Sequence, residues 1–240
     1  MSTPSLTVAI TAYNEEKTIE KSLTTVLEAI PENIQDYEII IINDASKDGT
    51  GRIIDELAKK YPHVLPVHNP VNLNQQGCYK KTIKLATKDY YFIIGGDNRI
   101  KKNSLHEVFT YVGKGDTVVL PYIENPQERN SFRTSLSDIF VHVLNLLFGF
   151  KIRYYNGPTI IKTSILKNLP IEANSFAFMA ETVVILLAQG YPYLEIPMVL
   201  NPDPKGMNPR AVSRNAKRVL KMIARLFWRV KIKREIKRIR

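Results

Sequence analysis

Segments typical of strands alternate with segments typical of helices over the first hundred residues of the chain. Four segments have a strand-like composition: Leu6–Ala12, Tyr37–Asn43, Val64–His68 and 90–94. Three segments between them carry apolar residues at helical spacing: 15–30, 50–61 and 76–86. Tyr37–Asn43 is almost continuously apolar, which is typical of a strand buried on both faces of a parallel sheet. The alternation predicts an α/β fold with a mostly parallel sheet flanked by helices.

The second half of the 240-residue chain is less regular. Helices are expected at 131–150 and 176–189, and strands at 158–161 and 191–196. The stretch 201–209 is rich in proline and glycine, and it predicts a division into a domain, 1–209, and a carboxy-terminal segment, 210–240. The longest apolar run near the middle, 139–150, is shorter than the roughly twenty residues that a transmembrane helix needs.

Two further features of the sequence indicate in which cellular compartment the protein is located. Cys78 is the only cysteine, so no internal disulfide is possible and nothing indicates an oxidising compartment. The amino-terminal residues lack the basic and apolar regions of a signal peptide. We therefore expect a cytoplasmic protein that does not cross a membrane.

Positive charge is concentrated at the carboxy-terminal end. Residues 210–240 contain thirteen Lys and Arg residues and one acid, Glu235, which gives a charge of +12, whereas the whole chain carries +11. Residues 1–209 therefore carry a net charge of −1. A near-neutral body with a basic segment argues against nucleic acid as a partner and favours an anionic membrane surface.

The basic segment has the pattern of an amphipathic helix. One helical face carries apolar residues at spacings of three and four: Val212, Ala216, Val219, Ile223, Leu226 and Val230. Leu226, Phe227 and Trp228 form an aromatic cluster of the kind found at the level of lipid headgroups. The pattern predicts a helix on the membrane surface. The alternative is a helix that packs on its own domain and leaves its basic residues in solvent.

Polar residues are clustered where three of the expected strands end, at 11–16, 43–50 and 95–99. Each cluster alone could be turn chemistry, because Asn, Asp, Ser and Gly favour turns and helix caps. In an open α/β sheet, however, ligands bind beyond the carboxyl ends of the strands. The three clusters together therefore predict one binding site at this edge of the sheet.

In these clusters the sequence resembles the family-2 glycosyltransferases, which have a GT-A (Rossmann-like) fold. The motifs are Tyr13-Asn14-Glu15, Asn43-Asp44-Ala45-Ser46-Lys47-Asp48-Gly49-Thr50, and Gly95-Gly96-Asp97 at the position of the family's Asp-X-Asp motif. Later motifs resemble the branch that makes dolichol- or polyprenyl-phosphate sugars: Asn156-Gly157, Glu181 and Glu195-Ile196-Pro197. The resemblance covers about residues 6–228 and implies sugar transfer from a nucleotide-diphosphate donor with inversion.

The resemblance also implies roles for residues at the donor site. Ala12, Tyr13, Glu15 and Asp44 would hold the nucleoside, with Asp44 accepting a hydrogen bond from a base N–H. Asp97 would face the diphosphate, directly or as the ligand of Mg²⁺ or Mn²⁺. Such a cation would neutralise charge on the departing diphosphate.

Two positions depart from the family pattern. Gly95 replaces the first Asp of the metal motif, and Arg99 stands where the polyprenyl-phosphate branch has a Gln. Mg²⁺ and Mn²⁺ require several oxygen ligands, so these changes weaken a metal site. Alternatively, the Arg99 guanidinium contacts the diphosphate beside Asp97 and replaces part of the charge of the cation. A metal-dependent, a metal-independent and an inactive protein all remain open.

The acceptor is expected near the helix 131–150. Arg129 and Arg133 lie at its head, and basic residues in this region bind the acceptor phosphate in the branch that the sequence resembles. The alternative is an ordinary amphipathic helix with exposed arginines. A phosphate acceptor needs no strong base, because its second pKa is about 6. A hydroxyl acceptor needs one, and Glu181 is the candidate.

Together these observations predict an inverting glycosyltransferase, bound peripherally to a membrane, that transfers a sugar to a polyprenyl-phosphate or other lipid acceptor. One rival hypothesis is transfer to a hydroxyl of a glycan or lipid. Another is a non-catalytic nucleotide-sugar-binding homologue, motivated by Gly95 and Arg99. A nucleic-acid-binding module is least favoured, because residues 1–209 are near neutral and carry no RNA- or DNA-binding motif.

Overall fold

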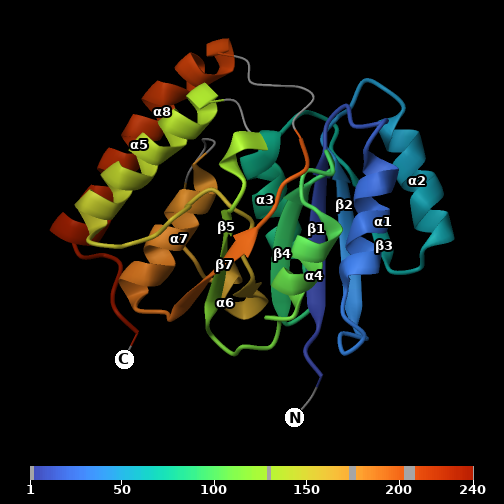
Figure 1. Ribbon diagram of the computed structural model, residues 1–240, viewed down its shortest axis with the longest axis horizontal. Helices are drawn as coiled ribbons and strands as arrows, with labels where there is room; N and C mark the ends of the chain where they lie inside the picture. The colour runs from blue at the N-terminus through green and yellow to red at the C-terminus, as the bar shows by residue number, and fades with distance from the viewer. Residues whose placement is uncertain (1–2, 129–130, 173–176, 203–208, 240) are drawn as a thin grey trace.

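A five-stranded sheet with the strand order β3-β2-β1-β4-β6 lies at the centre of the protein (Figure 1). The computed structural model describes residues 3–128, 131–172, 177–202 and 209–239. The strands are β1 (Leu6–Ala12), β2 (Tyr37–Asn43), β3 (Val64–His68), β4 (Tyr90–Gly95) and β6 (Ile161–Lys162). A second, parallel pair is formed by β5 (Val118–Ile123) and β7 (Tyr193–Met198).

Helices cover both faces of the sheet. The face that packs against Val8 and Ile10 of β1 is covered by α1 (Ile19–Ala29), α2 (Thr50–Lys60) and α4 (Lys102–Phe109). The face that packs against Ala9 is covered by α3 (Asn74–Leu85), α5 (Ser131–Phe148), α6 (Thr163–Lys167), α7 (Phe178–Gln189) and α8 (Pro209–Phe227). Two short segments are η1 (Pro126–Glu128) and η2 (Trp228–Ile232). The predicted three-layer α/β class is confirmed.

The register of β1 sets where the loops meet. β1 pairs in parallel with β2 on one side and with β4 on the other. Ala12 lies opposite Asn43, and Thr11 lies opposite Gly95. The ends of the three strands are therefore level with one another, and the polar loops that follow them emerge at the same edge of the sheet.

The second half differs from the sequence prediction in its strands. The expected strand at 158–161 is reduced to Ile161–Lys162, because the chain changes partner there: Ile160 bridges Val119 of β5, whereas Ile161 pairs with Tyr91 of β4. Strand β5 was not predicted. It contains Pro121, and a proline within a short apolar run weakens the strand signal.

The carboxy-terminal helix α8 packs on the domain. Met222, Ile223 and Leu226 are buried in the same core as α5 and α7, and Val219 and Val230 pack against it, whereas Ala216 is exposed. The division of the chain at residue 209 stays a prediction. Within the described ranges, no helix combines the length and the apolar content that a membrane span requires.

A buried carboxylate joins three segments at the edge of the sheet opposite the polar loops. Glu38 of β2 is 7% exposed. Its Oε1 accepts hydrogen bonds from Thr7 Oγ1 at 2.7 Å and from the Thr87 amide at 2.6 Å, and its Oε2 accepts from Thr87 Oγ1 at 2.8 Å. Glu38 thereby connects β1, β2 and the segment that enters β4.

We expect Glu38→Ala to lower the free energy of unfolding by about 3 kcal/mol, because it leaves buried donors on Thr7 and Thr87 without their acceptor. Urea denaturation followed by circular dichroism measures the change. Glu56→Ala is the matched control, since Glu56 is 57% exposed and forms an ion pair with Arg52 worth about 0.5 kcal/mol. Similar losses in both variants would contradict the role assigned to Glu38.

Candidate functional site

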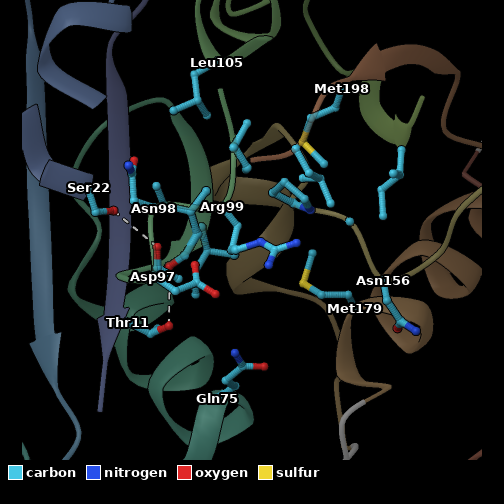
Figure 2. A pocket seen from close by; sticks show the side chains of 18 of the residues that line it. Thr11, Ser22, Gln75, Asp97, Asn98, Arg99, Leu105, Asn156, Met179 and Met198 are labelled. Carbon is cyan, nitrogen blue, oxygen red and sulfur yellow. Dashed lines mark hydrogen bonds between the residues drawn. The ribbon is translucent and has the colours of Figure 1, made fainter. Parts of the chain in front are cut away.

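A pocket lies beyond the carboxyl end of β4, between the main sheet and the β5–β7 pair. Its lining comes from β1, α1, α3, β4, α7 and β7 and from the segment 154–158. The polar and sulfur-containing side chains in it include Thr11, Ser22, Gln75, Asp97, Asn98, Arg99, Asn156, Met179 and Met198 (Figure 2). The site therefore lies at the edge of the sheet at which the sequence predicted it.

Asp97 and Arg99 enter the pocket from the turn that follows β4. Figure 2 shows Asp97 on the side of Thr11, whereas the Arg99 guanidinium extends across the pocket toward Met179. Among the described residues that line the pocket, Asp97 is the only acid and Arg99 the only base. The pocket thus offers one carboxylate and one permanent cation, which suits a phosphate-bearing ligand.

The backbone of this turn explains how both side chains reach the pocket. A Cβ at Gly95 would lie 3.0 Å from Asp97 Oδ1, so the carboxylate occupies the space that a side chain at position 95 would need. Asn98 has a φ of 52°, in the left-handed region that Asn tolerates better than most residues. The Asp97 side chain therefore packs closely over the end of β4.

The segment that follows β7 holds the turn in place. The Asn201 amide donates to the Arg99 carbonyl at 2.7 Å, and Asn201 Nδ2 donates to the Asn98 carbonyl at 2.8 Å. Beside it, Asn125 Nδ2 donates to the Leu200 carbonyl at 2.9 Å, and the Leu200 amide donates to Asn125 Oδ1 at 2.8 Å. The backbone that carries Arg99 is therefore bonded to the chain that leads toward α8.

The loops after β1 and β2 are joined by reciprocal hydrogen bonds. The Asn14 amide donates to Ser46 Oγ at 3.0 Å, and the Lys47 amide donates to Asn14 Oδ1 at 2.8 Å. Asn14 and Ala45 have positive φ angles of 56° and 59°. The two loops thus support each other in backbone conformations that are uncommon for residues other than glycine.

A second set of bonds continues this contact. The Gly49 amide donates to Glu16 Oε2 at 2.8 Å, and the Glu15 amide donates to Thr50 Oγ1 at 2.8 Å. Asp48 accepts from the amides of Thr50 and Glu16 at 3.1 and 3.3 Å. Burial alone favours the neutral acid, but the hydrogen bonds from Thr50 and Glu16 outweigh it and lower the pKa of the Asp48 carboxyl. Much of the second sequence motif therefore serves to hold the two loops together.

The residues predicted to hold a nucleoside lie together at this edge. The Asp44 amide donates to the Ala12 carbonyl at 2.8 Å. Tyr13 is 43% exposed, and Glu15 Oε2 accepts from Thr18 Oγ1 at 2.8 Å. These four residues follow the ends of β1 and β2, beside the pocket rather than in its lining. Their predicted role remains a prediction.

Asp44 also anchors the start of α3. Asp44 is 4% exposed. Its Oδ1 accepts hydrogen bonds from Asn69 Nδ2 at 2.8 Å and from the Leu73 amide at 2.7 Å. Burial, with a smaller contribution from the charge of Asp44, raises the pKa of the neighbouring Cys78 thiol to about 12. The thiol is therefore neutral and unreactive at neutral pH. Asp44 supports the helix that brings Gln75 to the pocket.

Glu181 lies outside the described lining of the pocket, and its predicted role as a base remains a prediction. It is fully buried on α7 and is absent from the pocket lining. Its Oε1 lies 3.4 Å from Arg229 Nη1 and 3.6 Å from Arg225 Nη2, and its Oε2 accepts from the Glu172 amide at 3.1 Å. The side chain is turned toward the carboxy-terminal segment, where it is the buried counter-charge of Arg229, whose side chain is 9% exposed.

The two predicted acceptor residues are not described. Arg129 lies outside the described residues, and so does the side chain of Arg133, whose backbone belongs to α5. Arg99 Nη2 lies 3.5 Å from the carbonyl of Glu128, the residue before Arg129. The pocket therefore adjoins the segment in which the acceptor residues were predicted.

The pocket offers few protein side chains that could bind a divalent cation. The described residues contain no group of three or more His, Cys, Asp or Glu side chains that could hold a metal ion. Mg²⁺, however, is often bound through one or two carboxylates together with phosphates of a substrate. The single carboxylate of Asp97 fits a cation that binds together with a diphosphate, and does not by itself form a metal site.

Sequence reasoning missed three polar residues around the pocket. Gln75 belongs to the polar segment 72–77, where its position before a helix was the available signal. Asn125 and Asn201 carried no local signal, because each acts through a hydrogen bond to a distant part of the chain.

Comparison of the sequence with protein families finds a match to the model described as Glycosyl transferase family 2, over residues 7–185. A dolichyl-phosphate beta-glucosyltransferase of Trichomonas vaginalis is 35% identical over 83 residues, which cover 30% of this chain and 26% of that protein. An abequosyltransferase of Salmonella typhimurium is 32% identical over 108 residues, 45% of this chain and 32% of that protein. The alignments thus span about a quarter to a third of these relatives.

Comparison with solved structures finds the same fold. Glucosyl-3-phosphoglycerate synthase from Mycobacterium tuberculosis, in complex with Mn²⁺, UDP and phosphoglyceric acid, has a TM-score of 0.73 and 14% identity, covering 93% of this chain and 78% of that one. A mannosyltransferase from Pyrobaculum calidifontis, in complex with GDP-Man and Mn²⁺, has a TM-score of 0.67 and 18% identity, covering 93% and 64%. At these identities the likeness concerns the fold.

We expect Asn201→Ala to weaken the binding of UDP or GDP about tenfold, because one hydrogen bond that orients the turn before Arg99 is lost. Isothermal titration calorimetry measures the affinity. In an Arg99→Ala background the same change should have no further effect, since Asn201 acts through Arg99. Asn168→Ala is the control: its Nδ2 bonds the Ser164 carbonyl on the surface, at 2.8 Å, and its loss should leave affinity unchanged. Additive losses in the double variant would rule out this coupling.

Proposed function

The chain belongs to glycosyltransferase family 2, and from that premise we propose that it is an inverting enzyme that moves a sugar from a nucleotide-diphosphate donor to a lipid phosphate. Its GT-A fold and its class, a nucleotide-sugar-dependent glycosyltransferase, follow from the comparisons. The acceptor, the inversion and the membrane location belong to the proposal. So do the individual residue roles.

The observation that carries the proposal is the chemistry of the pocket. Asp97 is the only carboxylate among the described lining residues, and Glu181 is paired with Arg229 in the core. A hydroxyl acceptor needs a general base beside it, whereas a phosphate monoester is largely ionised at neutral pH, with a second pKa of about 6. A site that presents one carboxylate next to one guanidinium supports an acceptor that is already an anion.

In the proposed reaction an oxygen of the acceptor phosphate attacks the anomeric carbon of the sugar. The bond between that carbon and the donor diphosphate breaks as the new bond forms, and attack from the opposite side inverts the anomeric centre. The leaving diphosphate gains negative charge, and the Arg99 guanidinium in the pocket is suited to bind it bidentately. The turn held by Asn201 keeps Arg99 directed into the pocket.

Donor recognition extends from the pocket to the ends of β1 and β2. We assign the nucleoside to the ends of β1 and β2 and the loops that follow them, which carry Ala12, Tyr13, Glu15 and Asp44 and adjoin the pocket. Asp97 would hold Mg²⁺ or Mn²⁺ together with the diphosphate, and a bound cation would supply charge neutralisation there. Two structural neighbours were solved with Mn²⁺ and a uridine or guanosine nucleotide, which supports a cation of this kind.

A lipid acceptor is supported by relatives and by the charge of the chain. The relative from Trichomonas vaginalis is a dolichyl-phosphate beta-glucosyltransferase. We assign the acceptor phosphate to Arg129 and Arg133, because Glu128, the residue before Arg129, contacts Arg99 of the pocket through its carbonyl. The +12 charge of residues 210–240 supports a peripheral location on an anionic membrane, where a polyprenyl phosphate would be presented.

Transfer from a panel of labelled nucleotide sugars to polyprenyl phosphate in anionic vesicles tests the proposal, with Asp97→Asn and Glu181→Gln compared. We expect Asp97→Asn to lower the rate about a hundredfold while leaving stability unchanged. Glu181→Gln should do the opposite: it lowers the free energy of unfolding by about 2 kcal/mol, because Arg229 loses its buried partner and keeps only the more exposed Glu172 and Glu235, and it keeps the rate per folded molecule. The folded fraction of each variant is followed by circular dichroism.

The outcomes separate the rival hypotheses. Loss of rate per folded molecule in Glu181→Gln would favour a hydroxyl acceptor and overturn the phosphate acceptor. Binding of a donor without any product would favour a non-catalytic homologue. A parallel series with EDTA decides the role of the cation, since a rate that survives chelation means that Arg99 suffices for the diphosphate.

A further inference from the structure

An apolar stripe on α5 remains exposed. Leu136, Ile139, Val143 and Leu146 follow one another at spacings of three and four residues, so they share one helical face. Their exposures are 40%, 61%, 38% and 85%. The opposite face of the helix carries Val141, Leu144 and Phe148, which are buried in the core. The domain core therefore does not cover these four apolar side chains, which remain in contact with solvent.

The neighbouring helix α8 carries a further exposed apolar residue. α5 and α8 lie side by side along the outer edge of the molecule (Figure 1). The contact includes Phe148 and Phe227, whose ring centroids are 6.3 Å apart. Leu220 lies seven residues before Phe227 and so faces the same flank of α8, toward α5, and it is 65% exposed. Leu220 is therefore an exposed apolar residue on the flank of α8 that faces α5.

The flank of α8 beyond Leu220 is basic. The helix contains six Lys and Arg residues and no acid. Lys217, Arg218 and Lys221 are exposed, and Lys217 and Lys221 are one turn apart on the face that looks away from the buried Met222 and Leu226. Asp138 is an exposed acid on α5. α5 thus presents an exposed apolar stripe, and the neighbouring α8 presents a row of exposed cations.

We propose that this face, made of Leu136, Ile139, Val143, Leu146, Leu220, Lys217 and Lys221 and called the α5–α8 face below, docks on an anionic lipid bilayer. The proposal deepens the proposed function, on whose lipid acceptor it rests. It also revises how the membrane is contacted: α8 buries Met222, Ile223 and Leu226 in the domain, so α5 supplies most of the apolar part, and α8 supplies Leu220 and the charge. A bilayer is favoured over a protein partner because shallow apolar insertion beside a row of cations matches lipid headgroups above acyl chains.

The position of the face relative to the pocket agrees with this partner. Arg99, which lines the pocket, lies 3.5 Å from the carbonyl of Glu128, three residues before α5 begins. A bilayer on the α5–α8 face would therefore lie along a helix that follows a residue in contact with the pocket, where a lipid phosphate has to enter.

Sedimentation of the full chain with vesicles tests the inference directly. The vesicles are phosphatidylcholine alone or phosphatidylcholine with about a third phosphatidylglycerol. We expect binding to the anionic vesicles only, and at least a tenfold loss of affinity in Ile139→Glu/Leu146→Glu and in Lys217→Glu/Lys221→Glu. The matched controls are Leu65→Glu and Lys59→Glu/Lys60→Glu, which make the same changes at exposed positions of β3 and α2, at the opposite end of the molecule. They should retain wild-type binding.

Vesicle binding requires no sugar transfer, so the result is independent of the proposed reaction. Each variant is checked for wild-type UDP or GDP affinity, which shows that the pocket is intact. Unchanged vesicle binding in the α5–α8 variants overturns the inference, as does equal loss in the controls. Sedimentation velocity tests whether the face binds a second copy of the chain instead. If the wild-type protein is a dimer and Ile139→Glu/Leu146→Glu is a monomer with unchanged vesicle binding, the face serves self-association.

Discussion

The parallel pairing of β1 with both β2 and β4 is the constraint on which the rest of the structure depends. Ile39, Ile40, Ile41 and Ile42 of β2 are nearly without exposure, and so are Val8 and Ile10 of β1. Each such side chain removed from water contributes about 1.5–3 kcal/mol, so a shift of register would be very costly. Once that register is set, the loops after three strands meet at one edge, and the pocket forms there.

The loops at this edge are built to keep each other in place. Asn14, Ser46 and Lys47 exchange backbone and side-chain hydrogen bonds between the loops after β1 and β2. The turn after β4 is held from another direction by Asn201. Rigid support of this kind is what a binding site for a charged ligand requires, because a misplaced guanidinium loses much of its bidentate interaction. The residues that face the ligand are therefore few, and the residues that hold them are many.

The parts of the fold with a strong local pattern could be predicted from the sequence. The continuous apolar run Tyr37–Asn43 and the spacing of the helices around it were sufficient for the parallel sheet and its polar edge. Asp97 and Arg99 were found because they follow a buried strand directly. Pro121 obscured β5, and the change of partner at Ile160 shortened β6, since neither effect is visible in a local pattern.

The parts that depend on distant contacts could not be predicted. The environment of Glu181 is made by Arg225 and Arg229, more than forty residues later in the chain. The apolar side of the tail helix was visible in the sequence, but periodicity is the same for a helix that faces a membrane and one that faces its own core. The exposed stripe of α5 could not be predicted for the same reason. Ile139, Leu146 and Leu144 are all apolar residues of one helix, and only the packed structure shows that Leu144 is buried and the other two are exposed.

The most direct test of the central claim is a crystal structure with a nucleoside diphosphate bound. The account predicts the diphosphate in the pocket beyond β4, with its oxygens within hydrogen-bonding distance of the Arg99 guanidinium and the nucleoside over the ends of β1 and β2. Asp97 should face the same phosphates, directly or through a cation. A diphosphate bound outside this pocket, with Arg99 still directed at the Glu128 carbonyl, would contradict the account.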